Sequence, residues 1–393
     1  MDFTKKKVFI IMNPSSTNSG SGTELSPFNL AARTSTPRTL NTIFQREGTA
    51  DYYFGPGLYL LNDIVLPPDT SIFGAGSHLT SFVQSAYVNT QPARAFMTMY
   101  PDIYRVTTSK FSGFTLMLAK TGPSGFASSG LQVFGDGILV EDVVVKNPRG
   151  DFALDRESFP IFVSSRIPGK DSYRPLVVHG NSVRNCRVCD PTVIGVEKYS
   201  YVTGIVVDNP PTLPGEIVNC FVDGPVMQAF SGSSVRIENN VANGARAFYY
   251  HDTYTANGVT IQGNRGVEME LGVNVNLYKA PWRCNDLLVT GNYFEISPSA
   301  PGCFGVYING VNRATITNNI FMAYIDTAYE GAANIIAMSE ADCSMVYLSG
   351  NRLVLPRMAK LTVMPSAWTH CKSPSRGDNW VVVNGVATPI YSA

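Results

Sequence analysis

The sequence predicts an all-β solenoid in which short parallel strands wind into stacked coils. A pattern of alternating apolar residues, a bend and an Asn recurs along the chain, for example at Val259–Asn264 and Leu287–Asn292. Such repetition indicates a solenoid, because each unit buries its apolar face only by stacking on its neighbours. Only 15% of the residues are charged and Gly is abundant, at 34 residues, which fits strands buried within a stack.

The spacing of the pattern is about 31 residues, enough for three strands and their turns. Asn tolerates the left-handed conformation that a sharp bend requires, and stacked Asn side chains can hydrogen-bond from coil to coil. The alternative, a two-sheet sandwich with Asn in ordinary turns, does not explain so regular a pattern. Further copies end at Asn240, Asn319 and Asn351, copies with Cys in the Asn position end at Cys186 and Cys220, and looser copies cover Phe111–Phe114 and Val140–Val143.

The N-terminal part predicts a strand, a loop and a helix before the coils begin. Val8–Met12 forms an apolar run that ends at Asn13-Pro14, and a polar, Gly-rich loop follows. Thr36-Pro37 opens a helix over about residues 36–47, since Thr is a good N-cap and Pro suits the first turn. Leu40, Ile43 and Phe44 share one face of this amphipathic helix. We expect the helix to cap the open end of the stack, whose unpaired strand edges would otherwise invite aggregation.

The β-helix, with its cap, is expected to form one domain over residues 1–353. Residues 354–393 leave the repeat and form a closing segment. Within that segment, Val381–Val386 contains an Asn-Gly pair between apolar residues, which predicts a hairpin. Excursions from the coils are expected at residues 147–160, 164–181, 209–215 and 324–333, and loops on a rigid scaffold often carry binding sites.

Residues 53–76 add a family resemblance. Gly55-Pro-Gly-x-Tyr59, Ile64-x-Leu-Pro67 and Ser71-Ile-x-Gly-x-Gly76 resemble the opening coils of the pectate-lyase-like right-handed parallel β-helix superfamily. The Asn-ended repeats resemble the asparagine ladder of that fold. The resemblance implies about ten right-handed coils built from three sheets, with clefts along the first sheet. It does not imply one activity, because the superfamily includes lyases, hydrolases, epimerases and non-catalytic phage or surface proteins.

Composition and charge limit the kinds of partner that the protein can bind. The formal net charge is zero and the longest basic run is Lys5–Lys7, so a nucleic-acid partner is not expected. Val8–Met12 is too short for a membrane span or a signal-peptide core. The seven Cys are scattered, and Cys186 and Cys189 form the only close pair, so we expect buried thiols rather than a disulfide framework. The resemblance implies an extracellular or cell-surface location, although no signal peptide is visible.

The coil register predicts where polar residues gather. Asn264 and Asn292 are 28 positions apart, so the same spacing would place Tyr250 over Tyr278 and His251 over Lys279. This polar cluster is expected near the end of the first sheet and its following turn. Its members are Arg246, Tyr249, Tyr250, His251, Asp252, Asn276, Tyr278, Lys279 and Arg283, with Asp208 at the like position two coils earlier.

The cluster suits a saccharide site, in which aromatic rings stack on sugars while Asn and Arg bind hydroxyls and carboxylates. A lyase that cleaves an acidic glycan by β-elimination needs a cation beside the carboxylate and a base for the C5 proton. We expect His251 or Lys279 as the base, Arg246 or Arg283 as the cation, and Tyr250 or Tyr278 as the proton donor. The substrate-binding residues would be Tyr249, Asp252, Asn276, Tyr278, Arg283 and Asp208. The alternative is that these polar residues only solvate a turn.

A glycoside hydrolase is less well supported, because it needs two carboxylates at a set distance. Asp155, Glu157, Asp208 and Asp252 are available, but no Asp-Asp pair with a following Gly-His-Gly occurs. Calcium would need acidic residues on adjacent coils, and Asp208 has no such neighbour. We therefore expect no metal and no cofactor. The charged segment from Asp155 to Arg174 either covers the cleft or forms a solvated loop.

The leading functional prediction is thus a polysaccharide lyase that acts on an acidic glycan. The alternative is a non-catalytic glycan-binding protein, such as a phage tailspike-like or surface adhesin, which could assemble as an oligomer and as a trimer if it is tailspike-like. A third possibility is a purely structural surface protein. We expect no membrane span in this chain.

Overall fold

The computed structural model describes residues 5–32, 36–61, 63–84, 95–100, 108–120, 127–168, 172–174, 178–252, 254–277, 283–297, 303–324, 333–338, 343–357, 375–376, 378–383 and 385–389. These residues divide into two compact units, 1–209 and 210–393. Strands dominate both units, and the described residues contain one α-helix. Among them no helix has the length and apolar character needed to cross a membrane.

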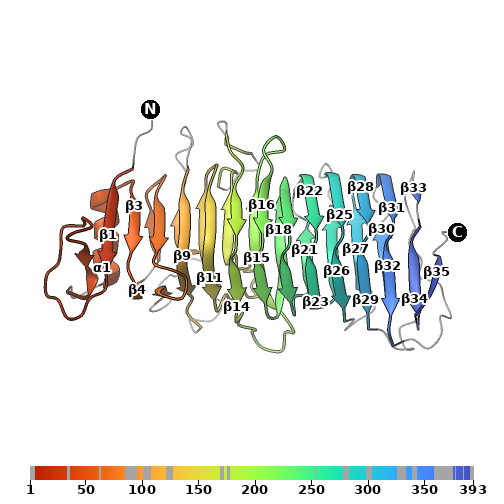
Figure 1. Ribbon diagram of the computed structural model, residues 1–393, viewed down its shortest axis with the longest axis horizontal. Helices are drawn as coiled ribbons and strands as arrows, with labels where there is room; N and C mark the ends of the chain where they lie inside the picture. The colour runs from red at the N-terminus through yellow and green to blue at the C-terminus, as the bar shows by residue number, and fades with distance from the viewer. Residues whose placement is uncertain are drawn as a thin grey trace. The chain divides into compact units, whose positions relative to one another are not determined.

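Unit 1 is a stack of parallel strands that follows the predicted coil pattern (Figure 1). One ladder joins β5, β8, β10, β12 and β15, and the other strands pair in parallel around β9 and β11. The elements are β1 (Lys7–Ile11), β2 (Phe28–Asn29), a 3-10 turn (Leu30–Ala32), α1 (Thr36–Glu47), β3 (Asp51–Phe54), β4 (Gly57–Leu61), β5 (Ile64–Leu66), β6 (Ser71–Gly74), β7 (Thr80–Gln84), β8 (Ala95–Met99), β9 (Lys110–Met117), β10 (Ser129–Phe134), β11 (Leu139–Lys146), β12 (Ile161–Ser164), β13 (Ser182–Arg184), β14 (Arg187–Cys189) and β15 (Ser200–Asp208).

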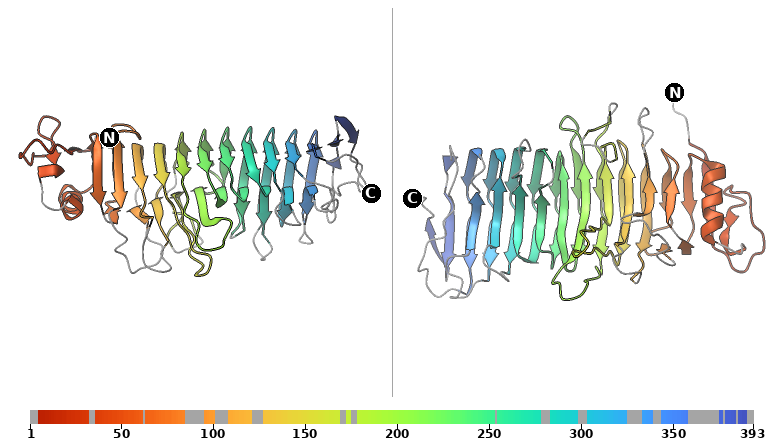
Figure 2. Two further views of the ribbon diagram at one scale, coloured as in Figure 1. Left: turned by 90° about the horizontal axis from the view of Figure 1, so that it is seen from below. Right: turned by 180° about the vertical axis from the view of Figure 1, so that it is seen from behind.

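Helix α1 occupies the range that the sequence predicts and lies beside the first strands of unit 1 (Figure 2). Its apolar face is buried, with Leu40, Ile43 and Phe44 at most 2% exposed. Phe44 packs edge-on against Tyr52, with ring centroids 4.7 Å apart. Gly48 ends the helix at φ 67°, and its N–H donates to the Phe44 carbonyl oxygen over 2.9 Å. The role of α1 as a cap stays a prediction.

Unit 2 winds three parallel ladders, which we name the first, second and third sheets. The first joins β18, β21, β24, β27 and β30, the second β16, β19, β22, β25, β28, β31 and β33, and the third β17, β20, β23, β26, β29, β32 and β34. A parallel β-helix is therefore confirmed as the fold class.

The strands of unit 2 are short, as three strands per coil require. They are β16 (Gly215–Val218), β17 (Phe221–Asp223), β18 (Val226–Ser233), β19 (Val235–Glu238), β20 (Val241–Asn243), β21 (Ala247–His251), β22 (Ala256–Gln262), β23 (Arg265–Met269), β24 (Leu271–Asn276), β25 (Cys284–Thr290), β26 (Tyr293–Ile296), β27 (Cys303–Asn309), β28 (Val311–Thr317), β29 (Ile320–Ala323), β30 (Ala333–Met338), β31 (Ser344–Ser349), β32 (Arg352–Leu355), β33 (Ser375–Arg376), β34 (Trp380–Val383) and β35 (Val386–Pro389).

The asparagine ladder runs through unit 2 between the second and third sheets. Asn264 Nδ2 donates to Asn292 Oδ1 over 2.9 Å, so the predicted stacking of these two residues is confirmed. Each rung also donates to a backbone carbonyl, as Asn292 Nδ2 does to Ile261 over 2.8 Å. Buried amides are thereby satisfied without water. The rungs are Asn240, Asn264, Asn292, Asn319, Asn351 and Asn379, and the backbone N–H of Cys220 donates to the first of them.

The bend that precedes each rung differs in one respect from the sequence expectation. The left-handed residue is not the ladder Asn but the residue before it, with φ between 54° and 68° in five coils. Gly or Asn fills this position, because only these residues adopt that conformation at low cost. The ladder Asn is free of that strain and keeps its amide in the core. The five left-handed residues are Asn239, Gly263, Gly291, Asn318 and Gly350.

Strands β33 and β34 continue the second and third sheets before the chain turns back. Asn379 is the last rung, and β34 pairs in parallel with β32. Strand β35 then pairs antiparallel with β34, from Trp380 opposite Pro389 to Val383 opposite Val386. This antiparallel pair lies where the sequence predicts a hairpin. The division at residue 353 between one domain and a closing segment stays a proposal.

Candidate functional site

The outer face of the first sheet in unit 2 carries a cluster of phenol and amide side chains. Tyr250, Asn274 and Tyr307 are direct partners on β21, β24 and β27. Asn276 and Asn309 pair two residues further on. Because side chains alternate along a strand, all five belong to the face opposite the apolar core. We call these five residues, together with Asp252, the first-sheet face.

A chain of hydrogen bonds connects this face across three coils. Asn309 Nδ2 donates to Asn276 Oδ1 over 2.9 Å. The Tyr250 phenol is hydrogen-bonded to Asn276 and to Asp252. Burial, followed by the charge and the hydrogen bond of Asp252, raises the pKa of Tyr250 to about 12, against smaller opposing effects of Asn276 and Arg246. Tyr250 is therefore a neutral proton donor at physiological pH.

Two amide oxygens in this face have no hydrogen-bond partner. Oδ1 of Asn274 and Oδ1 of Asn309 are both buried and unpaired, and Asn309 is only 4% exposed. An unpaired buried acceptor costs about 1–3 kcal/mol, so few persist without a reason. Both can accept a hydrogen bond from a hydroxyl group that reaches the face. The arrangement is suited to a ligand that is rich in hydroxyl donors.

The cation next to this face is already paired. Arg246 Nε lies 3.3 Å from Glu270 Oε2, and Arg246 Nη1 lies 3.8 Å from Met227 Sδ. The Arg246 side chain is 44% exposed, so solvent screens the pair. Among the described residues, no three His, Cys, Asp or Glu side chains gather as metal ligands.

The register predicted for the first sheet is wrong. Tyr250 pairs with Asn274 and not with Tyr278, and His251 pairs with Val275 and not with Lys279. His251 pairs with Val275 and Ala256 pairs with Cys284, so the chain between these pairs is four residues longer in the later coil. The spacing of 28 residues therefore holds at the ladder but not in the first sheet. Tyr278 and Lys279 lie outside the described residues.

Two of the predicted site residues face the core. His251 is 2% exposed, and its Nε2 lies 2.8 Å from the Tyr254 carbonyl oxygen. Its ring also packs edge-on against the Tyr254 ring at 4.6 Å. Tyr249 is fully buried and donates from its hydroxyl group to the Gly232 carbonyl oxygen over 2.7 Å. Their contacts support the fold of the coil and leave no surface for a substrate.

The remaining predicted residues are dispersed. Arg283 is half-buried just before β25, where its carbonyl oxygen accepts from the Ala256 N–H over 3.0 Å. Asp208 belongs to unit 1, ends β15 and is 1% exposed. Of the other carboxylates considered for a hydrolase, Asp155 and Glu157 also lie in unit 1, where Asp155 accepts from the Tyr201 hydroxyl over 3.1 Å and Glu157 accepts from Thr203. The first sheet thus brings together Tyr250, Asp252 and Asn276, with Arg246 nearby.

Sequence reasoning missed Asn274, Tyr307 and Asn309. The signal was present, because Val273–Asn276 and Gly305–Asn309 alternate apolar and polar residues with a period of two. Extending that alternation across neighbouring strands would have found all three. The spacing between ladder residues does not reveal these partners, because it takes no account of the length of the turn between two sheets.

Comparison with known proteins supports the fold. No protein-family model and no curated protein sequence matches the chain. Solved structures do match. The tailspike protein of E. coli bacteriophage HK620, in complex with a pentasaccharide, aligns with a TM-score of 0.60 and 13% identity over 88% of this chain and 61% of the tailspike. This chain therefore spans about three fifths of the tailspike's length.

Two further structures have similar folds. The A-module of the mannuronan C-5 epimerase AlgE6 from Azotobacter vinelandii aligns with a TM-score of 0.52 and 12% identity, over 88% of this chain and 94% of the module. The surface adhesin PfbA of Streptococcus pneumoniae aligns with a TM-score of 0.52 and 10% identity, over 90% of both chains. At these identities the likeness shows the fold alone. The right-handed parallel β-helix that the family resemblance implied is confirmed.

Proposed function

We propose that the protein binds a polysaccharide on the first-sheet face of unit 2. The observation that carries the proposal is the set of Tyr250, Asn274, Asn276, Tyr307 and Asn309 on adjacent strands of one face. Phenol rings offer apolar faces to sugar rings, and amides exchange hydrogen bonds with hydroxyl groups. The two unpaired amide oxygens add acceptors for such groups.

The solved structures of similar fold are consistent with this class of ligand. The tailspike was solved with a bound pentasaccharide, and the A-module belongs to a mannuronan epimerase. The third is described as a surface adhesin. An extracellular or cell-surface location, and assembly into an oligomer such as a trimer, are part of the same proposal. These likenesses support the kind of ligand, whereas the position of the site rests on the geometry of unit 2.

Binding is tested by measuring the affinity of purified protein for ligands selected on a glycan array. Tyr307→Ala and Asn276→Ala are expected to weaken the affinity at least about tenfold, since each removes a hydrogen-bonding or stacking group from the centre of the face. Tyr347→Ala is the matched control, because Tyr347 is a 41% exposed tyrosine on β31 in the second sheet. Unchanged affinity in both site variants would refute the position of the site, and no glycan ligand at all would refute the proposal.

A second candidate function is β-elimination on an acidic glycan, and the Tyr250–Asp252 contact favours it. Tyr250 keeps its proton at neutral pH, so it can donate that proton to the departing glycosidic oxygen. Arg246 is the nearby cation that could face a uronate carboxylate, if Glu270 releases it. The base is then Asp252 or Lys279, since the buried His251 is occupied by Tyr254. Arg283 stays a proposed partner of the carboxylate.

Elimination is tested by incubating the protein with pectate, alginate and related polymers and following the ultraviolet absorbance of the new C4–C5 double bond. Tyr250→Phe is expected to reduce turnover about 10²–10⁴-fold if Tyr250 is the acid, because that is the usual contribution of one proton-transfer group. Tyr307→Phe keeps the ring outside the proton-transfer pair and serves as the control. Absence of unsaturated products on every acidic polymer would leave glycan binding without turnover.

A further inference from the structure

A second column of outward-facing side chains runs across the third sheet of unit 2. Each of its members follows a ladder residue directly and begins a strand of that sheet. Successive members are direct partners from coil to coil, so they stand at the strand spacing of about 4.8 Å. The column consists of Phe221, Val241, Arg265, Tyr293, Ile320, Arg352 and Trp380.

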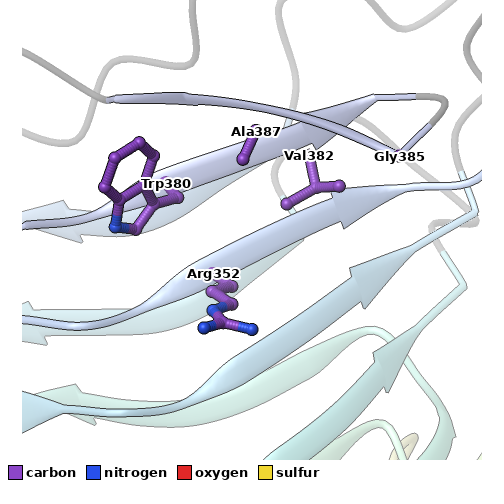
Figure 3. Close-up of a pocket in the computed structure, with 5 residues that line it drawn as sticks. All are labelled: Arg352, Trp380, Val382, Gly385 and Ala387. Carbon is purple, nitrogen blue, oxygen red and sulfur yellow. The ribbon is translucent and has the colours of Figure 1, made fainter.

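The C-terminal end of this column is a pocket of about 350 Å³ lined by Arg352, Trp380, Val382, Gly385 and Ala387. Figure 3 shows the Trp380 indole and the Arg352 guanidinium on neighbouring strands, with Val382 and Ala387 beside them. Strand β35 folds back over β34 and supplies one wall. The pocket thus combines an aromatic ring, a cation and an apolar wall.

The arginines of the column are available to a ligand. In the part of the chain that the structure describes, neither Arg265 nor Arg352 forms an ion pair, and both are exposed. Arg265 instead lies over the Tyr293 ring, with its guanidinium carbon 5.8 Å from the ring centroid. The next outward positions beside Ile320, Arg352 and Trp380 are apolar, at Met322, Val354 and Val382, whereas the one beside Tyr293 is Glu295. At the C-terminal end of the column, the Arg352 charge therefore stands on an aromatic and apolar surface, whereas Glu295 lies beside the Tyr293 ring further along.

We propose that this column is a second glycan site, which binds an acidic polysaccharide that crosses the strands of the third sheet. Trp380 stacks on a sugar ring in the pocket, and Arg352 pairs with a carboxylate or sulfate group of that sugar. Arg265 and Tyr293 form a second contact three strands away, about 14 Å along the column. The inference is independent of the first-sheet face, because it rests on different side chains on a different sheet.

The charge pattern favours an acidic ligand over a second copy of the chain. Two copies that docked by this same face would bring arginines against arginines, and like charges placed opposite each other destabilise an interface. Two pairs of a guanidinium and an aromatic group, separated by Ile320, match a polymer whose repeating unit offers both a ring face and an anionic group. A neutral glycan would satisfy the rings but leave the arginines unpaired.

The test measures binding of the full chain to polygalacturonate, alginate, hyaluronan and heparin by surface plasmon resonance, with neutral dextran as the reference polymer. At least one acidic polymer is expected to bind, dextran is not, and the affinity is expected to fall as salt rises. Arg352→Gln is expected to weaken binding at least about tenfold and to reduce its salt dependence. Trp380→Ala is expected to weaken binding similarly, whereas Trp380→Phe retains a stacking ring and most of the affinity.

Two controls separate this site from others. Arg313→Gln changes an exposed arginine on β28 that already pairs with Asp286, and it should leave binding unchanged. Tyr307→Ala changes the first-sheet face and should leave Arg352-dependent binding intact. Thermal unfolding establishes that each variant is folded. The proposal is overturned if no acidic polymer binds, if folded Arg352→Gln and Trp380→Ala variants bind normally, or if they change only the oligomeric state, which would identify an interface between copies.

Discussion

At the scale of single residues, the ladder asparagines specify where each coil turns. Asn292 accepts hydrogen bonds from the backbone N–H and the side-chain amide of Asn264, both over 2.9 Å. It donates to Ile261 and to Asn319 over 2.8 and 2.9 Å. A single buried side chain therefore provides hydrogen-bond partners for polar groups on two neighbouring coils. No apolar residue of similar size can do the same.

Asn292→Ala is expected to lower the free energy of unfolding by about 1–3 kcal/mol or more, because it leaves several buried polar groups without partners. Urea unfolding followed by circular dichroism measures the change. The matched control is Asn243→Ala, since Asn243 is half-buried and makes one side-chain bond, to Asp223 over 3.0 Å. Equal destabilisation by the two substitutions would contradict a special role of the ladder.

Two buried thiols should be chemically inert in the native protein. Burial, with a smaller effect of Asp190, raises the pKa of Cys189 to about 11, and burial, with Asp286 nearby, raises the pKa of Cys284 to about 12. The reactive species is the thiolate, so neither residue should be alkylated by iodoacetamide at pH 8. Mass spectrometry of the peptides that contain them measures the labelling, with urea-unfolded protein as the fully labelled control.

The same shifts predict how stability depends on pH. A raised thiol pKa means that the native state holds its proton more tightly than the unfolded chain. The contribution of these thiols to stability is complete below about pH 9, and it falls as pH rises towards 11 and 12.

In the labelling experiment, rapid alkylation of Cys189 in the native protein at pH 8 would contradict the prediction, because it would show that the coil opens far more often than the burial of Cys189 suggests.

At the scale of elements, a buried ion pair holds a long excursion of unit 1 against the end of β10. Asp136 Oδ1 lies 2.5 Å from Arg174 Nη1, and both side chains are fully buried. The second oxygen of Asp136 accepts from the Val178 N–H over 3.1 Å. Arg174 and Val178 belong to the excursion predicted over residues 164–181. The contact shows how a charged loop is fixed to a β-helix rather than left in solvent.

Asp136→Ala is expected to cost about 3–5 kcal/mol of unfolding free energy, because it leaves the Arg174 charge buried without its carboxylate. Asp286→Ala is the control, since Asp286 pairs with Arg313 in solvent, where such pairs contribute little. Urea unfolding of both variants gives the comparison. Similar small losses would show that water or another group replaces the Asp136 carboxylate.

Elements that depend on a few neighbouring residues could be predicted from the sequence, whereas pairings that depend on turn lengths could not. Alternation and the Asn positions predicted the strands and the ladder, and the Thr36-Pro37 start with the apolar face of Leu40, Ile43 and Phe44 predicted α1, because each is a local property of a few residues. The pairing of Tyr250 with Asn274 could not be predicted from the ladder, because the chain from Val275 to Cys284 is four residues longer than its partner from His251 to Ala256. Burial of His251 follows from the alternation that also turns Tyr249 inward, and its contacts with the Tyr254 carbonyl and ring are local. The polar character of the site was predictable, whereas its register was not.

At the scale of the whole molecule, the described strands pair mostly with strands from other coils. In unit 2, for example, Asn240 and Asn264 are 24 positions apart, and Asn319 and Asn351 are 32 positions apart. Each pairing therefore closes a long loop before any contact compensates for the lost entropy. Parallel architectures of this kind fold slowly and expose strand edges while they do so.

Refolding from urea is therefore expected to take seconds or longer, and its yield is expected to fall as the protein concentration rises. Stopped-flow and manual-mixing fluorescence measure the rate, and light scattering measures the aggregated fraction. A helical protein of similar length serves as the reference. Complete refolding within milliseconds, independent of concentration, would contradict this expectation.

The asparagine ladder also has a mechanical consequence. Its bonds in unit 2 join one coil to the next, as do the bonds between the strands, so a pull on the last coil loads one interface at a time. When that interface yields, a coil such as the 28 residues from Asn264 to Asn292 is released as a slack chain of about 90–100 Å. The next coil then bears the load with its own rung intact. Under tension, unit 2 should therefore unfold one coil at a time and lengthen in regular steps, instead of unfolding in one event.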